Sequence, residues 1–219
     1  MPLERLHFTN REDWLAGRTT GIGASSAAAA VGISKWQTNQ ELWEIMAGHK
    51  KSKRVNNRFI EFGNKMEPVM REMFKVKHPE YQLSYNQFDI LYLSERPWLR
   101  ATLDGELYTD SPTHYGANHG ILEIKTATLT TRAQWDEWKD GYPQGYFCQT
   151  VHQLLATGWD FVILYALLMG QNEWVVREYR IDRTDQNVAD GMEWLLKEET
   201  KFWGYVEADK RPPLILPEI

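Results

Sequence analysis

The sequence is poor in cysteine and contains no long apolar run. Its 219 residues include a single cysteine, Cys148. One thiol excludes an internal disulfide framework and a cysteine-rich zinc site, so we expect Cys148 to be a small buried apolar residue. No stretch approaches the roughly 18 apolar residues of a membrane-spanning helix. The first residues also lack a basic segment followed by an apolar one. We therefore expect a cytoplasmic protein without membrane contact.

The chain also lacks an excess of positive charge. Its formal net charge is −5, which disfavours a protein that coats nucleic acid, because non-specific binding depends on many Lys and Arg contacts with phosphates. The charge is unevenly distributed, with an acidic segment around Glu193, Glu198 and Glu199 and a basic stretch from residue 49 to 58. The basic candidates for phosphate contacts are Lys50, Lys51, Lys53 and Arg54. A solvated loop after a helix explains the basic stretch equally well.

Two nucleotide-binding motifs are absent from the glycine-containing turn at residues 18–26, Arg-Thr-Thr-Gly-Ile-Gly-Ala-Ser-Ser. It has no Gly-Lys-Ser/Thr ending of a Walker loop, and no convincing strand precedes it, as the dinucleotide fingerprint requires. Its backbone N–H groups could still approach a phosphate, with Arg18 as a bidentate clamp and Ser25 or Ser26 capping a helix. A purely structural entry to that helix is the simpler alternative. The six histidines show no ligand-like spacing.

The most informative residues are Asp104, Glu123 and Lys125. Glu123 and Lys125 alternate with Leu122 and Ile124 in a short predicted strand, so the two charged side chains share one face. If the strand that ends at Asp104 is its neighbour, Asp104 joins them in one pocket. The alternative is a solvated Glu-Lys pair on an exposed strand, with Asp104 opening a turn, since Glu-x-Lys is common by chance.

Two acids and a lysine suit metal-assisted hydrolysis of a phosphodiester. Mg²⁺ prefers oxygen ligands and is usually held by one or two carboxylates together with waters and substrate phosphate oxygens. Asp104 and Glu123 would supply those carboxylates. Lys125 would orient or deprotonate the attacking water and offset charge that builds on the phosphate.

Two predicted helices carry further polar candidates. Glu67 lies beside an apolar stripe formed by Met66, Met70, Met73 and Phe74. It could complete a metal shell, directly or through a water, although an ordinary exposed glutamate is the default. In the later helix, spacing places Tyr146, Gln149 and Gln153 on one face. They could hydrogen-bond a water or a phosphate oxygen, or they could be satisfied polar residues where the helix meets the sheet.

The order of apolar patterns predicts a central mixed sheet flanked by helices. Helices are expected at about 25–31, 38–48, 64–77, 131–139, 144–157 and 185–205. Strands are expected at 87–93, 98–104, 106–109, 120–126, 161–169 and 173–181. This order indicates an α/β or α+β class. With 42% apolar residues the chain can bury one core, so we expect one domain over residues 1–219, with a core at about 14–181 and a C-terminal helix and tail at 185–219.

Taken in order, these residues resemble the YqaJ-like viral recombinase family, which contains phage lambda exonuclease and belongs to the PD-(D/E)xK nuclease superfamily. The matching motifs are Arg18-x-x-Gly21-Ile22-Gly23-Ala24-Ser25, Gly63-Asn64-x-x-Glu67, Asp104-Gly105, Glu123-Ile124-Lys125 and Tyr146-x-x-Gln149. They span about residues 14 to 157, and the ordered set is more specific than any single motif. One departure is the long separation of Asp104 from Glu123, with residues 111–118 as an extended hairpin tip. The resemblance implies an α/β, restriction-endonuclease-like core.

The resemblance also implies a Mg²⁺-dependent exonuclease that degrades one strand of linear double-stranded DNA from its 5′ end. The remaining 3′ single strand would serve recombination with a single-strand annealing protein in a phage or prophage system of a bacterial cell. Two Mg²⁺ ions are implied, with Mn²⁺ as a substitute, and family members form a ring-shaped homotrimer around DNA. An acidic exterior with a basic inner surface would reconcile the net charge with DNA binding.

The resemblance assigns roles to individual residues as well. Asp104, Glu123 and the Ile124 carbonyl would be metal ligands, and Glu67 would lie near the second metal. Lys125 would activate or orient the water, and Gln149 matches an active-site position. Arg18 with Ser25 matches a pocket for the 5′-phosphate.

Two other hypotheses remain open. An endonuclease or single-strand nuclease of the same superfamily would use the same metal pocket and would be recognised by digestion of closed circular DNA. A non-catalytic module that binds DNA ends would keep the fold with an inert pocket. The presence of Asp104, Glu123 and Lys125 together favours an enzyme, because a binding module has no chemical need for all three.

Overall fold

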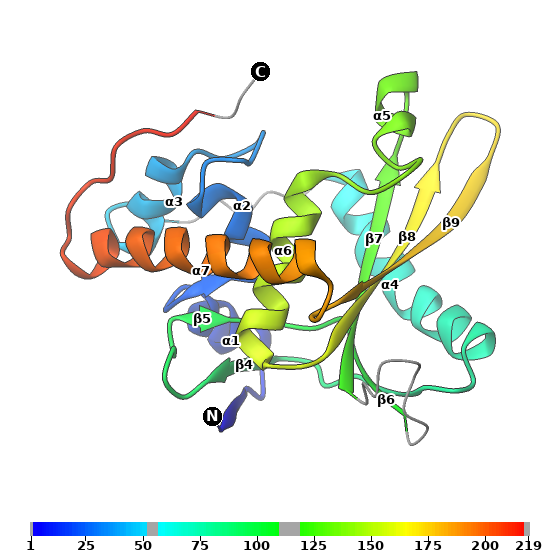
Figure 1. The fold of residues 1–219 in the computed structure, drawn as a ribbon, viewed down its shortest axis with the longest axis horizontal. Helices are drawn as coiled ribbons and strands as arrows, with labels where there is room; N and C mark the ends of the chain where they lie inside the picture. Colours follow the sequence, from blue (N-terminus) through cyan, green and yellow to red (C-terminus); the bar gives the residue numbers. More distant parts are fainter. Residues whose placement is uncertain (1, 52–56, 110–118, 217–219) are drawn as a thin grey trace.

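A mixed five-stranded sheet forms the centre of the molecule (Figure 1). The computed structural model describes residues 2–51, 57–109 and 119–216. In spatial order the strands are β3 (Gln82–Ser84), β6 (Gly105–Tyr108), β7 (His119–Thr128), β8 (Phe161–Met169) and β9 (Trp174–Asp182). The pair β7 and β8 is parallel, and the other neighbouring pairs in this sheet are antiparallel. The expected α/β class with a central mixed sheet is confirmed.

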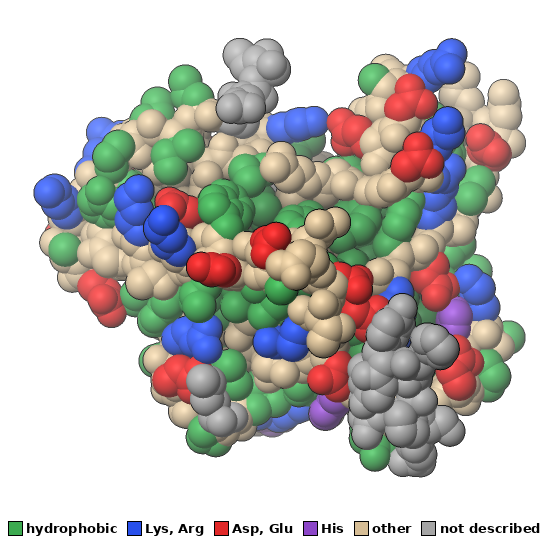
Figure 2. All heavy atoms as spheres, in the orientation of Figure 1, with side chains coloured by type: hydrophobic (Ala, Val, Ile, Leu, Met, Phe, Trp, Pro, Cys, Tyr) green, Lys and Arg blue, Asp and Glu red, His purple; other side chains and the backbone are tan. Residues whose placement is uncertain are grey.

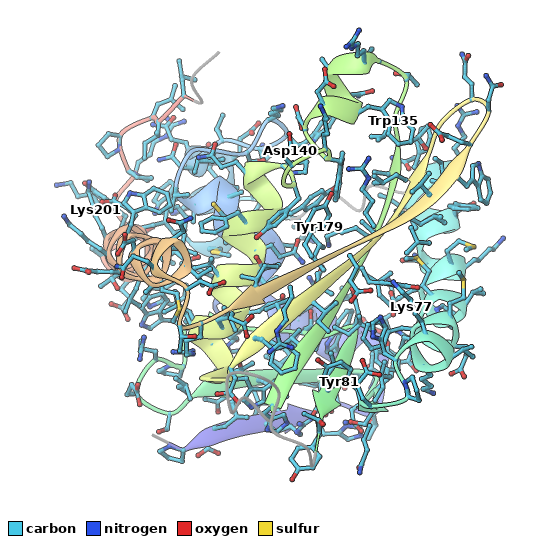
Figure 3. The ribbon with its side chains drawn as sticks, turned by 45° about the vertical axis from the view of Figure 1, so that its right-hand side comes forward. Lys77, Tyr81, Trp135, Asp140, Tyr179 and Lys201 are labelled. Carbon is cyan, nitrogen blue, oxygen red and sulfur yellow. The ribbon has the colours of Figure 1, made fainter. Side chains whose placement is uncertain are left out.

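Helices cover both faces of this sheet. On one face Met70 and Phe74 of α4 (Arg58–Lys77) belong to a buried cluster that includes Leu122 and Ile124 of β7. On the other face α6 (Gln144–Thr157) and α7 (Gln186–Glu207) pack against a second cluster that includes Ile121. Figure 3 shows Lys77 of α4 and Tyr179 of β9 on opposite sides of the sheet. Successive residues of β7 therefore face different helices, and its residues 120–124 are buried.

Two small sheets support the N-terminal part. The first pairs β1 (Leu3–His7) with β4 (Asp89–Leu93) in antiparallel fashion, and the second pairs β2 (Ile22–Gly23) with β5 (Leu99–Arg100) in parallel fashion. The remaining elements are α1 (Arg11–Arg18), a 3₁₀ turn (Ala24–Ser26), α2 (Ala27–Ala30), α3 (Asn39–Met46) and α5 (Arg132–Asp136). In Figure 1 α7 crosses in front of α6. Helix α6 belongs to the connection between β7 and β8.

Most expected elements are present, with corrections at their ends. Helix α6 and strand β8 have the predicted bounds. Helix α4 begins at residue 58 rather than 64, because the Asn57 side chain accepts hydrogen bonds from the backbone N–H groups of Phe59 and Ile60, both at 3.0 Å. Strand β5 covers residues 99–100 and not 98–104. After the bridge between Ala101 and Leu91 the chain leaves this small sheet.

Four elements were not expected: β1, α1, β2 and β3. Helix α1 is capped by the Asn10 side chain, which accepts from the Asp13 N–H at 2.9 Å, but none of its residues is buried. Without an apolar stripe the sequence gives little helical signal there. The apolar stripe predicted on α4 is buried at Met70 and Phe74, but its member Met73 is 44% exposed, so the prediction that this residue belongs to the buried side is wrong. Cys148 is buried as expected.

No helix in the part of the chain that the structure describes is both long enough and apolar enough to cross a membrane. The expected hairpin tip at residues 111–118 and the basic residues Lys53 and Arg54 lie outside the described residues.

Candidate active site

Glu123 and Lys125 lie on the β7 face that is covered by α6. Their side chains are in hydrogen-bonding contact, from Lys125 Nζ to Glu123 Oε1, while Leu122 and Ile124 face α4. The predicted sharing of one face is therefore confirmed. The alternative of a solvated pair on an exposed strand is wrong, because Glu123 is only 2% exposed. A buried carboxylate needs compensating donors or a cation.

Asp104 lies at the bend that leads into β6, rather than at the end of a preceding strand. The antiparallel pairing of β6 with β7 ends at Gly105 and Leu122, so Asp104 and Glu123 lie just beyond the paired residues. There the Asp104 Oδ2 atom accepts a hydrogen bond from the Ile124 N–H at 2.8 Å. The N–H and carbonyl of one strand residue point to the same edge, so the Ile124 carbonyl lies on the Asp104 side of β7.

Two amides of α6 hold the Glu123 carboxylate. Gln149 Nε2 donates to Oε1 and Gln153 Nε2 donates to Oε2, each at 2.5 Å. Tyr146, one turn earlier, lies with its ring 5.4 Å from Lys125 Nζ. The predicted common face of these three α6 residues is present, and Gln153 is the member whose contact with Glu123 the sequence did not single out.

These groups open into one cavity of about 540 Å³. The predicted site residues in its lining are Arg18, Ser25, Glu67, Asp104, Glu123, Ile124, Lys125 and Gln149. They come from α1, the 3₁₀ turn, α4, β7, α6 and the bend before β6. Residues that are up to 131 positions apart in the sequence therefore surround one space. Tyr146, Lys50 and Lys51 are not part of this lining.

Arg18 and Ser25 form the polar side of the cavity nearest the N-terminal elements. Arg18 Nη2 donates to Ser25 Oγ at 3.3 Å, and its guanidinium lies 4.7 Å from the centre of the Trp14 ring. Burial lowers the pKa of Arg18, which the charges of Asp104 and Glu123 partly oppose. Capping by Ser25 or Ser26 is wrong, because neither short helix here has a side-chain cap. Gly21 serves packing, since a Cβ would lie 2.5 Å from the Trp98 carbonyl.

Glu67 is tied to the site through Arg71, which sequence reasoning missed. Arg71 Nη1 contacts Glu67 Oε1 at 2.5 Å and the Asp104 carbonyl at 3.1 Å, and its guanidinium stacks 3.7 Å from the Tyr85 ring centre. The four-residue spacing of Glu67 and Arg71 was the available signal. Glu67 is thus part of the cavity and not an ordinary exposed glutamate.

Two described residues of the basic stretch pair with nearby acids rather than line the cavity. Lys50 Nζ lies 3.5 Å from Glu44 Oε2, and His49 lies 2.5 Å from Asp209. Glu199, one of the residues of the predicted acidic segment, is fully buried. Figure 2 shows acidic and basic side chains interspersed over the face that α7 crosses.

The donor set fits a hard divalent cation with few protein ligands. No group of three or more His, Cys, Asp or Glu side chains among residues 2–51, 57–109 and 119–216 is arranged to hold a metal. Two carboxylates, Asp104 and Glu123, and the Ile124 carbonyl are nevertheless the kind of incomplete oxygen set that Mg²⁺ takes with waters. Burial, and then the charges of Glu123 and Glu67, raise the pKa of Asp104 well above its usual range. A cation at this position would relieve that excess of negative charge.

Lys125 partly compensates the same charges. Burial lowers its pKa, but the carboxylates of Glu123 and Asp104 together raise it above the ordinary value for lysine. Lys125 is therefore an ammonium group in this arrangement, held between the two acids at the edge of the cavity.

Comparison with known proteins gives concordant results. The family model described as the YqaJ-like viral recombinase domain matches residues 13–160. Protein YqaJ of Bacillus subtilis (strain 168) is 26% identical over 208 residues, or 89% of this chain, and the chain spans 56% of that relative's length.

Solved structures share the fold. An alkaline exonuclease, LHK-Exo, from Laribacter hongkongensis is 19% identical, with a TM-score of 0.66 over 91% of this chain and 94% of the other. Its complex with dAMP gives a TM-score of 0.67 at 17% identity, with the same coverage of both chains. A phage-related exonuclease from Haemophilus somnus 129PT gives 0.52 at 15% identity, over 86% of this chain and 96% of the other.

Proposed function

This chain belongs to the YqaJ-like viral recombinase family, and we propose that it is a metal-dependent deoxyribonuclease that degrades linear double-stranded DNA from its 5′ ends. The observation that carries this proposal is the convergence of Asp104, Glu123 and Lys125 in one cavity, with Arg18 and Ser25 on its wall. The likeness to structures called exonucleases supports the same conclusion.

In this proposal Asp104, Glu123 and the Ile124 carbonyl hold Mg²⁺. A metal held there would supply charge stabilisation for a phosphodiester and a more acidic water, and Glu67 would lie near a second ion of a two-metal arrangement. Mn²⁺ would replace Mg²⁺ because it accepts the same oxygen ligands. Lys125, already hydrogen-bonded to Glu123, orients the attacking water, and Gln149 fixes the Glu123 oxygen that faces the cavity.

The direction of digestion is proposed from Arg18 and Ser25. A guanidinium in a partly buried position recognises a terminal phosphate by charge-assisted hydrogen bonds, and Ser25 Oγ adds a polar contact. If the terminal phosphate were held there, the next phosphodiester of the strand would lie near Asp104 and Glu123, which line the same cavity. The product would be a 3′ single strand, suited to a single-strand annealing protein in phage-type recombination.

Digestion of linear duplex DNA labelled at either end tests the proposal. We expect Mg²⁺-dependent loss of nucleotides from 5′ ends, abolished by EDTA. Asp104→Asn should lower the rate at least about 100-fold, because losing several kcal/mol of charge stabilisation has that effect. Asp209→Asn is the matched control: Asp209 is exposed, its backbone has φ of 47°, which Asn tolerates, and its rate should stay unchanged.

Other substrates separate the alternatives. Cleavage of closed circular DNA would favour an endonuclease, and a preference for single strands would favour a single-strand nuclease of the same superfamily. Binding to DNA ends without digestion of any substrate would favour the non-catalytic module and contradict the proposal.

A further inference from the structure

Gln153 holds Glu123 from the side opposite the cavity. Its Nε2 atom donates to Glu123 Oε2 at 2.5 Å, and the whole residue is buried with 0% exposure. Gln149 makes the corresponding contact to Oε1 but lines the cavity. The two amides, one helical turn apart on α6, therefore hold different oxygens of one carboxylate. The two donors to Oε1, Gln149 and Lys125, line the cavity, whereas Gln153 does not.

The side-chain amide of Gln153 has a cost for the stability of the fold. Its Oε1 atom is buried and has no hydrogen-bond partner among the described residues. A buried acceptor without a partner destabilises the fold, and an apolar side chain of similar length would avoid this loss. Rotating the amide would bring its oxygen against Glu123 Oε2, so the contact fixes the orientation of the amide. The presence of an amide at this buried position is explained if its N–H group is needed to hold the Glu123 carboxylate.

We propose that Gln153 is a positioning residue that makes Glu123 a one-oxygen ligand and thereby favours Mg²⁺ over Ca²⁺. This inference rests on the proposed function. Gln153 is fully buried and does not line the cavity, so it holds Oε2 on the side away from a cation. Oε1, which Lys125 and Gln149 reach from the cavity wall, is the oxygen that a cation would meet. Mg²⁺ requires a small, near-ideal octahedron, whereas Ca²⁺ accepts more oxygens and readily takes a carboxylate through both. A carboxylate whose orientation is fixed should therefore bind Mg²⁺ in preference to Ca²⁺.

The test measures metal binding to the full chain without DNA. Free Mn²⁺ is followed by its paramagnetic resonance signal, and bound Mn²⁺ is then displaced by Mg²⁺ or by Ca²⁺. We expect Gln153→Met, which keeps the length but removes the donor, to weaken Mg²⁺ binding about 10- to 100-fold, the usual effect of losing a group that orients a metal ligand. Ca²⁺ binding should weaken less, so the preference for Mg²⁺ should fall.

Two further variants control for packing. Thr150→Val removes a polar group from another fully buried position of α6, where the hydroxyl donates to the Phe147 carbonyl at 3.1 Å, and it should leave both affinities unchanged. Gln153→Asn keeps the amide but is one methylene too short to reach Glu123, so it should reproduce the effect of Gln153→Met. It also replaces Gln153→Met if that variant does not fold.

The outcomes are distinct. Wild-type chain that binds no divalent metal would overturn the proposed function and this inference with it. Wild-type binding with unchanged Mg²⁺ affinity in the Gln153 variants would overturn the inference alone. Equal weakening of Mg²⁺ and Ca²⁺, or the same loss in Thr150→Val, would also overturn it, because either result indicates general loosening of the site.

Discussion

The two acids of the candidate site are compensated to different degrees. Glu123 accepts hydrogen bonds from Lys125, Gln149 and Gln153, whereas among the described residues Asp104 accepts one, from the Ile124 N–H. Burial and the charges of Glu123 and Glu67 raise the pKa of Asp104, and the single hydrogen bond from the Ile124 N–H only partly offsets them. The less compensated carboxylate is the one that gains most from a cation, which is why Asp104 is the residue to change in the first activity test.

Arg18 is expected to determine the preference for phosphorylated ends. Replacing it with Gln should remove a charged hydrogen bond to the terminal phosphate, worth about 1.5–3 kcal/mol, or roughly 10- to 100-fold in rate. The loss should be confined to 5′-phosphorylated duplexes, and 5′-hydroxyl duplexes should be digested as before. Initial rates on the two matched substrates measure the effect.

A surface arginine provides the control for that experiment. Arg132 has a side chain that is 95% exposed and does not line the cavity, so Arg132→Gln should leave the ratio of the two rates unchanged. Equal losses on phosphorylated and hydroxyl ends in Arg18→Gln would exclude a role in recognising the 5′-phosphate.

Among the elements, α6 connects the site to the C-terminal helix. His152, next to Gln153, contacts Glu199 of α7 through Nδ1 at 2.7 Å and the Arg100 carbonyl through Nε2 at 2.9 Å. Both side chains have 0% exposure. Burial alone would lower the pKa of His152, but the charge and hydrogen bond of Glu199 raise it above the ordinary value. The pair therefore stabilises α6 against both α7 and β5 in its charged form.

This pair predicts a pH-dependent contribution to stability. Because the pKa of His152 is higher in the folded chain, its stabilisation is complete below about pH 6.5, the value in the unfolded chain, and is lost as the pH rises through the folded value. Glu199→Gln should lower the free energy of unfolding by about 2 kcal/mol at pH 6. The difference from wild type should shrink at higher pH, as measured by urea unfolding at several pH values.

The neighbouring Glu198 gives a matched control. Its side chain is partly exposed and lies 3.7 Å from Lys201, so Glu198→Gln makes the same chemical change in a surface pair and should have a small effect at every pH. A wild-type advantage over Glu199→Gln that stays constant from pH 6 to pH 9 would show that His152 does not carry the charge.

Elements whose sequence pattern is local could be predicted, whereas contacts that depend on packing could not. Strand β8 is a continuous apolar run, and α6 ends at Gly158, whose φ of 74° favours glycine, so local patterns determine both. Helix α1 has no buried face and could not be recognised. The site residues on β7 and α6 were found by spacing. The distinction between Gln149 and Gln153 depends on the packing of α6 on β7, which spacing does not contain.

At the scale of the whole molecule, the fold places short N-terminal elements and the central sheet around one cavity. The formal charge of −5 does not suggest a protein that coats DNA, and acidic and basic side chains are interspersed on the face shown in Figure 2. An enzyme that acts at DNA ends needs only local contacts, such as the one proposed for Arg18. Continuous digestion, in contrast, requires that the protein stay on its substrate, and enclosure of the DNA by several subunits would provide this without a strongly basic surface.

The family resemblance implies a ring-shaped homotrimer, and we propose that this assembly makes digestion by this chain processive. Light scattering should give a mass of three subunits, and dilution below the assembly range should dissociate it by mass action. With DNA bound first and heparin added together with Mg²⁺, the trimer should continue to digest each occupied molecule, because an enclosed duplex cannot dissociate sideways. Diluted protein should stop after short tracts under the same conditions. A monomer that resists the heparin trap would contradict the ring, and a trimer that stops as soon as heparin is present would separate assembly from processivity.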